Sequence, residues 1–285
     1  GQAISITMSV ILAWMLMSVW ALAIGIVIGT FVQTVLGHIL LKSHGHAIRM
    51  ERESLHSLVR FGRWIFLATL ITFLGGNGMQ LVQAKLVSID TLGKLYVAGT
   101  IGSALGDLTN RIATAVGFPA LANIARGQPH RMRSVLDRIR VRMFIAVLPG
   151  FIALSLISGP LIHTLYDARY AAASNYLAII AITSAMSVIT VEYQNAFIAS
   201  GNSRIHFIVM SVFMILRLAG IILGFYLGGV EGMLVGSGVA VLATYFVTAY
   251  YAQKAGWLSP RTDSVAITVI FLGACVSYFV HGGTL

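Results

Sequence analysis

Long apolar runs separated by short polar stretches follow one another along the whole chain. They predict nine membrane-spanning segments, the first of them short, because about 20 apolar residues in a helix cross a hydrocarbon core of ~30 Å. The breaks include Gly-Asn at 201–202, Gly-Gly at 228–229 and Ser-Pro at 259–260, which are typical turn sequences. The predicted spans are 3–18, 20–41, 57–84, 93–124, 142–165, 171–199, 204–227, 231–252 and 264–281.

The character of these runs favours helices over the strands of a membrane barrel. In a bilayer each backbone amide must bond within the protein, which leaves helices or a closed barrel. Barrel strands alternate between apolar and polar residues over ~10 positions, whereas these runs are longer and uniformly apolar. Only 10% of the residues are charged and the mean hydropathy is +0.87, against about 25% charged in soluble domains. We therefore expect an all-α, polytopic bundle of transmembrane helices.

The basic residues are distributed unevenly between the two sides of the predicted bundle. Fourteen of the 19 Lys and Arg lie in or beside alternate loops, and only three, Lys85, Lys94 and Arg169, lie on the other side. Because basic residues concentrate in cytoplasmic loops, the first set is predicted to be cytoplasmic. Anionic lipid then accounts for the net charge of +10, and no nucleic-acid partner is expected. The cytoplasmic set is Lys42, Arg49, Arg52, Arg60, Arg63, Arg126, Arg131, Arg133, Arg138, Arg140, Arg142, Arg204, Lys254 and Arg261.

Several polar residues fall inside the predicted spans, where an ionisable group is costly and usually faces protein or a watery cavity. Four of them are charged. Asp107 and Arg111 lie four apart on one helix, with the acid first, which suits a side-chain pair. The candidate residues for a substrate cavity are Asn77, Gln80, Asp107, Asn110, Arg111, Glu192, Asn195 and Arg217.

Two interpretations of these charges remain open. In the first they hold helices together, with Asp107 paired to Arg111 and Glu192 paired to Arg217 on the adjacent helix. In the second, Arg111 and Arg217 face a cavity, where a planar guanidinium suits a phosphate or carboxylate. Such a cavity attracts an anionic head group.

Small residues and prolines within the spans predict close helix packing and kinks. Glycines four apart allow two helices to approach closely in a membrane, and proline inside a helix removes a hydrogen bond and can kink it. The glycine pairs are Gly25/Gly29, Gly102/Gly106, Gly224/Gly228 and Gly232/Gly236, and the prolines are Pro119 and Pro149.

The motifs of common enzymes are absent from the sequence. The chain has no nucleotide-binding phosphate loop, no hydrolase or metalloprotease motif, and only short loops on the predicted outer side. A single cysteine, Cys275, excludes an intramolecular disulfide and a zinc site built from cysteines. We therefore expect neither an enzyme nor a cofactor or metal. Because the chain begins at Gly1 within an apolar run, we interpret it as part of a longer protein.

Several short motifs, in their order along the chain, resemble those of Wzx-like oligosaccharide flippases, a family in the superfamily of multidrug (MATE) exporters and the lipid II flippase. One expected feature is missing, because family members often carry an acid late in the helix corresponding to 57–84, where this chain has Asn77-Gly-Met-Gln. The motifs are VWAL at 19–22, LVRFGR at 58–63, QAKLVS at 83–88, LGKLYVA at 92–98, GFPAL at 117–121 and LYDARYAAA at 165–173.

The resemblance implies a fold of two six-helix lobes around a central cavity, with alternating access. On that map, residues 1–42 are the last two helices of the first lobe and 43–56 form a basic cytoplasmic linker. Residues 57–254 are the second, MATE-like lobe, and 255–285 carry an additional transmembrane helix.

The implied function is translocation of an undecaprenyl-pyrophosphate-linked oligosaccharide across the bacterial inner membrane for surface polysaccharide export. Expected partners are the lipid-linked oligosaccharide, membrane lipids, and polysaccharide polymerase or export proteins. Two alternatives stay open: a MATE-type drug/cation antiporter, and a non-transporting membrane scaffold of a polysaccharide-synthesis complex.

Overall fold

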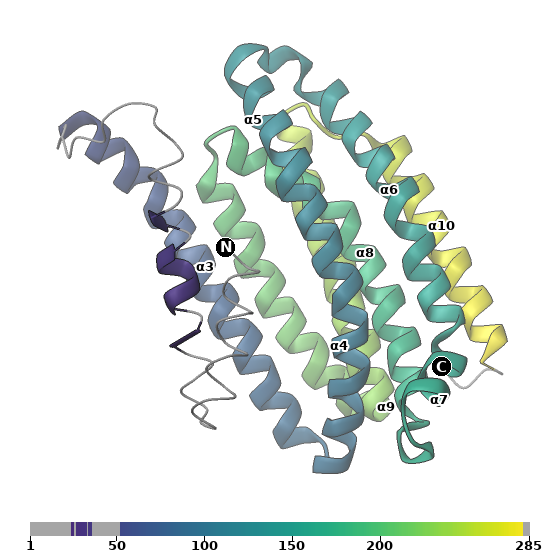
Figure 1. The fold of residues 1–285 in the computed structure, drawn as a ribbon. Coiled ribbons are helices and arrows are strands. Elements are labelled where there is room, and N and C mark those ends of the chain that lie inside the picture. Colours follow the sequence, from purple (N-terminus) through teal and green to yellow (C-terminus); the bar gives the residue numbers. More distant parts are fainter. Residues whose placement is uncertain (1–23, 26, 33, 36–51, 282–285) are drawn as a thin grey trace. The chain divides into compact units, whose positions relative to one another are not determined.

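The computed structural model describes residues 24–25, 27–32, 34–35 and 52–281 (Figure 1). The chain divides into two units, residues 1–54 and 55–285. In the first unit, 24–25, 27–32 and 34–35 are helical. The predicted span 3–18 and residues 43–51 of the predicted linker lie outside the described residues.

The described part of the second unit is built from helices joined by short turns. Five helices are long and apolar enough to cross a membrane: Phe61–Leu86, Pro129–Leu156, Ala173–Ala199, Ser203–Lys254 and Pro260–Val280. The chain is therefore an all-helical, multi-pass membrane protein. The elements are α3 (Arg52–Leu86), α4 (Ile89–Ile112), the π-helical turn η1 (Ala113–Gly117), α5 (Phe118–Gly127), η2 (Pro129–Arg131), α6 (Met132–Leu156), α7 (Ser158–Leu165), η3 (Ala168–Tyr170), α8 (Ala173–Ala199), α9 (Ser203–Lys254) and α10 (Pro260–Val280).

Helix α8 lies at the centre of the second unit. It contacts α4, α5, α6, α7, α9 and α10, and in Figure 1 it lies behind α4 and between α6 and α9. Buried positions occur on every side of it, from Leu177 to Phe197. A helix that is apolar all round is stable when other helices enclose it, so the composition of α8 accounts for its central place.

Helix α9 turns back on itself at a pair of glycines. Its 52 residues would extend about 78 Å as one straight helix, more than twice a hydrocarbon core of ~30 Å. The backbone leaves the helical region at Gly228 and at Gly229, where φ is 62° and ψ is −141°, a combination that only glycine adopts readily. The predicted break at 228–229 is thus confirmed, and α9 has the length of two passes.

The two halves of α9 pack backbone against backbone through glycines. A Cβ on Gly220 would overlap the carbonyl of Gly236, and a Cβ on Gly224 would overlap that of Gly232. The predicted packing role of Gly232/Gly236 is confirmed. The pairing of Gly224 with Gly228 is wrong, because Gly228 belongs to the turn and Gly220 completes the packing face.

The helix that carries Asp107 and Arg111 continues from α4 through η1 into α5. Pro119 is the second residue of α5, two positions after the π-helical turn ends at Gly117. Since proline has no N–H and its ring crowds the preceding turn, the helix widens there, so the kink predicted at Pro119 takes the form of a π-turn. The predicted span 93–124 falls on this run but is not among the five apolar helices, because polar residues occupy its middle.

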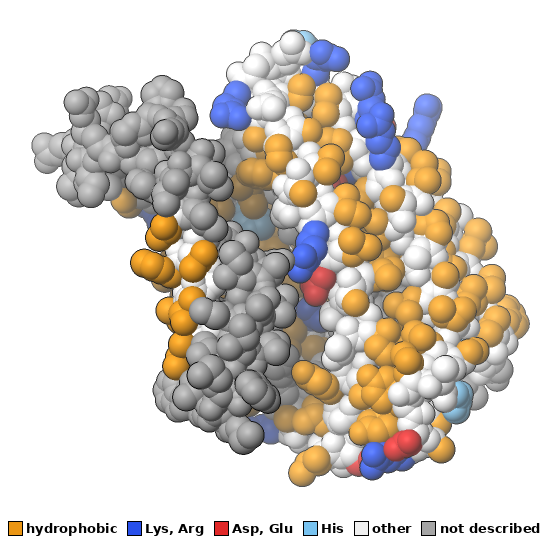
Figure 2. All heavy atoms as spheres, in the orientation of Figure 1, with side chains coloured by type: hydrophobic (Ala, Val, Ile, Leu, Met, Phe, Trp, Pro, Cys, Tyr) orange, Lys and Arg blue, Asp and Glu red, His pale blue; other side chains and the backbone are white. Residues whose placement is uncertain are grey.

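Many of the basic residues assigned to loops lie on helices. Helix α3 already begins at Arg52, and α5, η2 and α6 together cover residues 118–156 except Gln128, so the arginines at 52–63 and 126–142 lie on helices. Arginines in these end turns can extend to the membrane surface while the helix continues inward. In Figure 2, basic side chains gather at the α5–α6 end of the second unit, and hydrophobic side chains cover the flank of α6 and α10. The exposed arginines at that end include Arg126, Arg131, Arg133, Arg138 and Arg142.

Replacing Gly236 by alanine should destabilise the protein, because the added methyl group meets the backbone of Gly220 and the two halves of α9 must separate. We expect a loss of about 1–3 kcal/mol, as for overpacked cores, measured by thermal unfolding in detergent. Gly99→Ala is the matched control, since a Cβ at that helical position meets nothing within 4 Å. Equal melting temperatures for the two variants would contradict the close packing.

Candidate functional site

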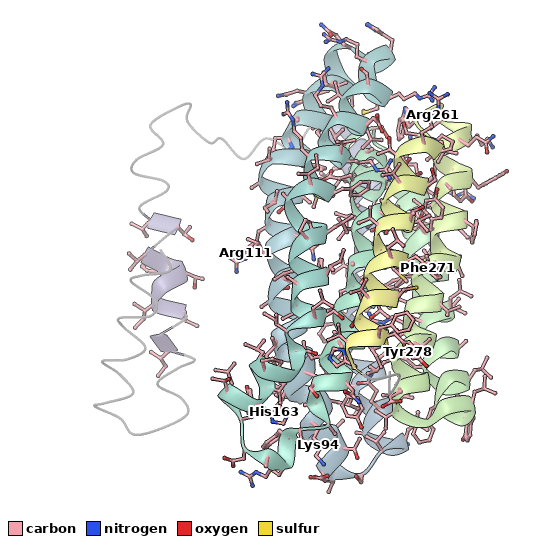
Figure 3. The ribbon with its side chains drawn as sticks, turned by 90° about the vertical axis from the view of Figure 1, so that its right-hand side faces the viewer. Lys94, Arg111, His163, Arg261, Phe271 and Tyr278 are labelled. Atoms are coloured by element: carbon pink, nitrogen blue, oxygen red, sulfur yellow. The ribbon has the colours of Figure 1, made fainter. Side chains whose placement is uncertain are left out.

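A stripe of polar residues runs along the exposed face of α4 and η1. Its members recur every three or four residues, which places them on one side of the helix, and all are exposed. Arg111 lies about halfway along the bundle and points away from the neighbouring helices (Figure 3). Lipid cannot satisfy such groups, so this face requires water, a ligand or protein. The stripe consists of Thr100, Ser103, Asp107, Arg111 and Thr114, with Asn110 beside it.

The two charges of the stripe do not neutralise each other. The ion pairs among the described residues are Lys94–Asp90, Arg140–Asp263 and Arg169–Asp167. Asp107 and Arg111 are exposed and form no ion pair with another described residue. Asn110 is also exposed, and its backbone carbonyl oxygen accepts a 2.8 Å hydrogen bond from the hydroxyl of Thr114. The stripe therefore offers a cation, an anion and an amide to a ligand.

Two further candidates lie on α3. Asn77 and Gln80 are both exposed, and the amide nitrogen of Asn77 donates a 2.9 Å hydrogen bond to the carbonyl of Phe73 on its own helix. Within the described residues, no hydrogen bond joins either of them to the α4 stripe. They form a second polar patch rather than a direct extension of the first.

Glu192 is buried beside the π-helical turn. It is 1% exposed, Oε2 accepts a 3.4 Å hydrogen bond from the amide of Asn195, and Oε1 has no partner among the described residues. A Cβ on Gly117 would lie 2.7 Å from both carboxylate oxygens. Gly117 thus makes room for this carboxylate where the helix of the polar stripe widens.

The pair between Glu192 and Arg217 is not formed in the structure. Glu192 bonds to Asn195 instead, and the guanidinium carbon of Arg217 lies 5.6 Å from the ring centroid of Phe213, one turn earlier on α9. Arg217 forms no ion pair with another described residue. The predicted pairing of Glu192 with Arg217 is therefore not observed.

The strongest polar cluster of the second unit centres on Arg140, which the sequence interpretation placed in a loop. Arg140 is fully buried. It forms an ion pair with Asp263 and donates hydrogen bonds to the hydroxyl of Tyr193 at 2.7 Å and to the carbonyl of Ile189 at 3.2 Å. Asp263 also accepts from the hydroxyls of Tyr193 and Tyr245, at 3.1 and 2.9 Å. The cluster joins α6, α8, α9 and α10.

A periodic signal in the sequence could have identified this cluster. Arg140 follows Leu136 by four residues and precedes Phe144 by four, and both are buried, so it occupies a core position of the apolar face of α6. Asp263 likewise lies three residues before Ala266 and seven before Ile270, which are both buried, so it lies on the buried face of α10. Apart from Arg140 Nε, which has no hydrogen-bond partner among the described residues, its charged and hydroxyl groups bond to one another or to the backbone. We therefore interpret the cluster as a structural fastening rather than a ligand site.

Asp263→Ala should lower the stability of the protein strongly. The charge of Arg140 would stay buried without its partner, which costs about 3–5 kcal/mol, and adding Arg140→Met should recover part of the loss. The measurement is thermal unfolding in detergent. Asp90→Ala is the control, because Asp90 is 73% exposed in its pair with Lys94 and such pairs contribute about 0–1 kcal/mol. Equal losses in the two single variants would refute the fastening role.

No group of three or more metal-ligating residues occurs in the part of the chain that the structure describes. The candidate site thus consists of exposed polar side chains on α4 and α3 and the buried carboxylate of Glu192 on α8.

Comparison with known proteins places the chain in a family. Residues 1–175 match the model of a family described as polysaccharide biosynthesis protein, and this is more than half of the 285 residues. The match includes the α4 stripe. Neither the curated proteins nor the solved structures contain a match. The chain therefore belongs to the polysaccharide biosynthesis protein family, the flippase family that its motifs resemble.

Proposed function

We propose that the protein translocates an undecaprenyl-pyrophosphate-linked oligosaccharide across the bacterial inner membrane for export of surface polysaccharide. Membership of a polysaccharide biosynthesis family and a multi-pass helical bundle both fit a membrane transporter of that pathway. Transport proceeds by alternating access, with the lipid tail in the bilayer and the glycan in a watery cavity. No covalent bond is made or broken.

The observation that carries this proposal is the exposed polar stripe of α4. Arg111 lies 22 residues after the start of α4 and 16 before the end of α5, so about 33 Å and 24 Å of helix lie on its two sides. Its charge is therefore far from both helix ends, at a depth where a lipid-facing arginine is costly. A cavity that admits water and a polar head group explains why the stripe is exposed.

The chemistry of the cavity follows from its side chains. Arg111 and Arg217 lack ion-pair partners among the described residues and contact the pyrophosphate or acidic sugars, because a guanidinium binds phosphate oxygens in pairs. The amides of Asn77, Gln80, Asn110 and Asn195 hydrogen-bond to sugar hydroxyls. Asp107 completes the polar wall beside Arg111.

In this proposal, residues 57–254 form a MATE-like lobe with six passes, two of them supplied by α9. Residues 1–42 add two passes and 255–285 one, which gives nine. The π-turn at 113–117 provides the point at which the α4–α5 helix bends between states, since π-turns are frequent at functional sites. Glu192 packs at that point.

A drug/cation antiporter is the second candidate, and Glu192 favours it. Its buried Oε1 lacks a partner among the described residues, and an unpaired buried carboxylate is a natural site for a proton or cation. The two functions differ in the expected phenotype: an antiporter confers ion-dependent drug efflux, whereas a flippase mutant loses surface glycan.

Changing Arg111 and Arg217 together to alanine in the full-length protein should reduce surface glycan at least tenfold, with lipid-linked oligosaccharide accumulating at the inner leaflet. Each lost charge-assisted hydrogen bond costs about 1.5–3 kcal/mol, and 1.4 kcal/mol corresponds to a factor of ten. Surface glycan and the lipid-linked pool are measured in cells that lack the native protein.

Arg126→Ala with Arg169→Ala is the matched control, because both arginines are exposed and lie outside the polar stripe. It should leave export normal. Normal export by the Arg111/Arg217 variant, at normal abundance in the membrane, would refute the roles given to these two residues.

A further inference from the structure

Two adjoining hollows lie on the flank of α6 and α10. The first, of about 580 Å³, is bounded by apolar residues such as Ile145 and Leu148 of α6 and Val265 and Val269 of α10. The second, of about 780 Å³, is polar and lies at the end of the same two helices. Arg261 and Thr262 line both. The two hollows therefore adjoin at these residues, and together we call them the α6–α10 groove, with an apolar part and a polar part.

The polar part is basic. His130, Arg133 and Arg261 line it, and the two arginines are exposed and form no ion pair with another described residue. Its one acid, Asp137, accepts a 2.6 Å hydrogen bond from the hydroxyl of Thr262. The two arginines without ion-pair partners thus outnumber the one acid, and guanidinium groups are well suited to binding a phosphate.

The apolar part opens sideways to the surroundings of the helix. Ile145 is 71% exposed and Val265 64% exposed, so the groove accepts a chain from the bilayer without passing through the protein. From Arg261 to Val269 it follows about 12 Å of helix. Figure 3 shows Arg261 at one end of α10, with Phe271 and Tyr278 further along the helix. A ligand that fits has its charge at the helix end and its apolar chain along the membrane-spanning part.

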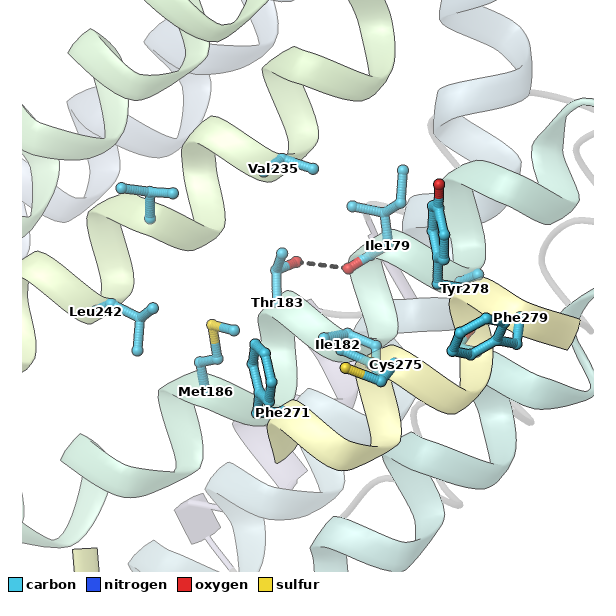
Figure 4. Close-up of a pocket in the computed structure, with 14 residues that line it drawn as sticks. Ile179, Ile182, Thr183, Met186, Val235, Leu242, Phe271, Cys275, Tyr278 and Phe279 are labelled. Carbon is cyan, nitrogen blue, oxygen red and sulfur yellow. Dashed lines mark hydrogen bonds between the residues drawn. The ribbon is translucent and has the colours of Figure 1, made fainter. Parts of the chain in front are cut away.

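A neighbouring groove between α8, α9 and α10 gives an internal comparison. It measures about 630 Å³ and is lined by residues such as Met186, Leu242 and Phe271 (Figure 4). No charged side chain lines it. Apolar hollows thus occur on both sides of α10. Of the two grooves, the α6–α10 groove is the one that ends in arginines.

We propose that the α6–α10 groove is a binding site for an anionic membrane phospholipid. Its phosphate lies between Arg133 and Arg261, and an acyl chain follows Ile145, Leu148 and Val265 into the bilayer. Basic pockets between helices at the membrane surface are suited to anionic lipid head groups. None of its lining residues belongs to the α4 stripe, so the site is separate from the proposed transport path.

The bound lipid braces α6 against α10. The hydrogen bond from Thr262 to Asp137 and the ion pair of Arg140 with Asp263 cross the same helix contact. A ligand seated on both helices favours their association, and a ligand that binds only the folded state raises its stability. Phosphatidylglycerol should therefore raise the melting temperature more than phosphatidylcholine.

The test uses the full-length protein purified in detergent, with thermal unfolding and native mass spectrometry after addition of each lipid. Two variants address the two parts of the groove: Arg133→Ala with Arg261→Ala removes the cations, and Val265→Trp fills the apolar part. Each should reduce the phosphatidylglycerol-specific shift at least fivefold. The matched controls are Arg126→Ala with Arg138→Ala, which removes two exposed arginines outside both hollows, and Val239→Trp, which fills the other groove.

Selective stabilisation by phosphatidylglycerol that both test variants lose and both controls retain supports the proposal. An equal response to phosphatidylcholine overturns it, and so does an equal loss in the control variants, which would indicate diffuse surface charge. A full response to inorganic phosphate alone would show that the apolar part of the groove has no role in binding, and it would overturn the proposal of a lipid ligand. Stronger binding of a polyprenyl phosphate than of phosphatidylglycerol would contradict the assigned occupant.

Discussion

Arg140 is fully buried where α6, α8, α9 and α10 meet, and in a membrane the protein itself has to neutralise that charge. Asp263 supplies the opposite charge and two tyrosine hydroxyls complete the carboxylate's contacts. The other end of α10 is held by a 2.7 Å hydrogen bond between Ser155 and Ser277. Helix association in lipid gains little from the hydrophobic effect, so such polar contacts determine where α10 lies.

The polar residues of the second unit fall into two classes with different consequences. Those of the Arg140 cluster are buried or half-buried and bond to one another, with Nε of Arg140 lacking a partner among the described residues. Those of the α4 stripe are exposed far from the helix ends, and Arg111 and Asp107 form no ion pair with another described residue. A buried hydrogen-bonded network adds rigidity, whereas an open polar stripe in an apolar bundle requires water, a ligand or protein against it. The first class fastens helices α6, α8, α9 and α10 together, and the second forms the candidate site on α4.

Much of the helical organisation could be predicted from the sequence, because apolar runs and turn residues are local signals. The breaks at 201–202, 228–229 and 259–260 were all predicted, and each separates or divides helices in the structure. Contacts between helices could not be predicted in the same way. Glu192 was matched with Arg217 because the two residues lie on adjacent helices, yet pairing also depends on the direction in which each side chain leaves its helix.

The candidate site shows the same limit. The polar character of Asp107 and Arg111 was evident from the sequence, but their exposure depends on which face of α4 packs against α8, and pairing between them depends on the conformations of their side chains. Arg140 was missed because charge in a stretch rich in arginine was interpreted as a loop. Its spacing from Leu136 and Phe144 shows that a helix period extends into that stretch.

The glycine turn of α9 also has a consequence for biosynthesis. Basic residues lie near both ends of the hairpin, at Arg204 and Lys254, and none lies at its tip around Gly228 and Gly229. Basic residues resist translocation, so both ends of the hairpin favour the same side while its tip crosses the membrane. The two halves can then enter the bilayer together, already in contact through Gly224 and Gly232. The charges at its two ends thus favour the same orientation of this hairpin as its glycine turn requires.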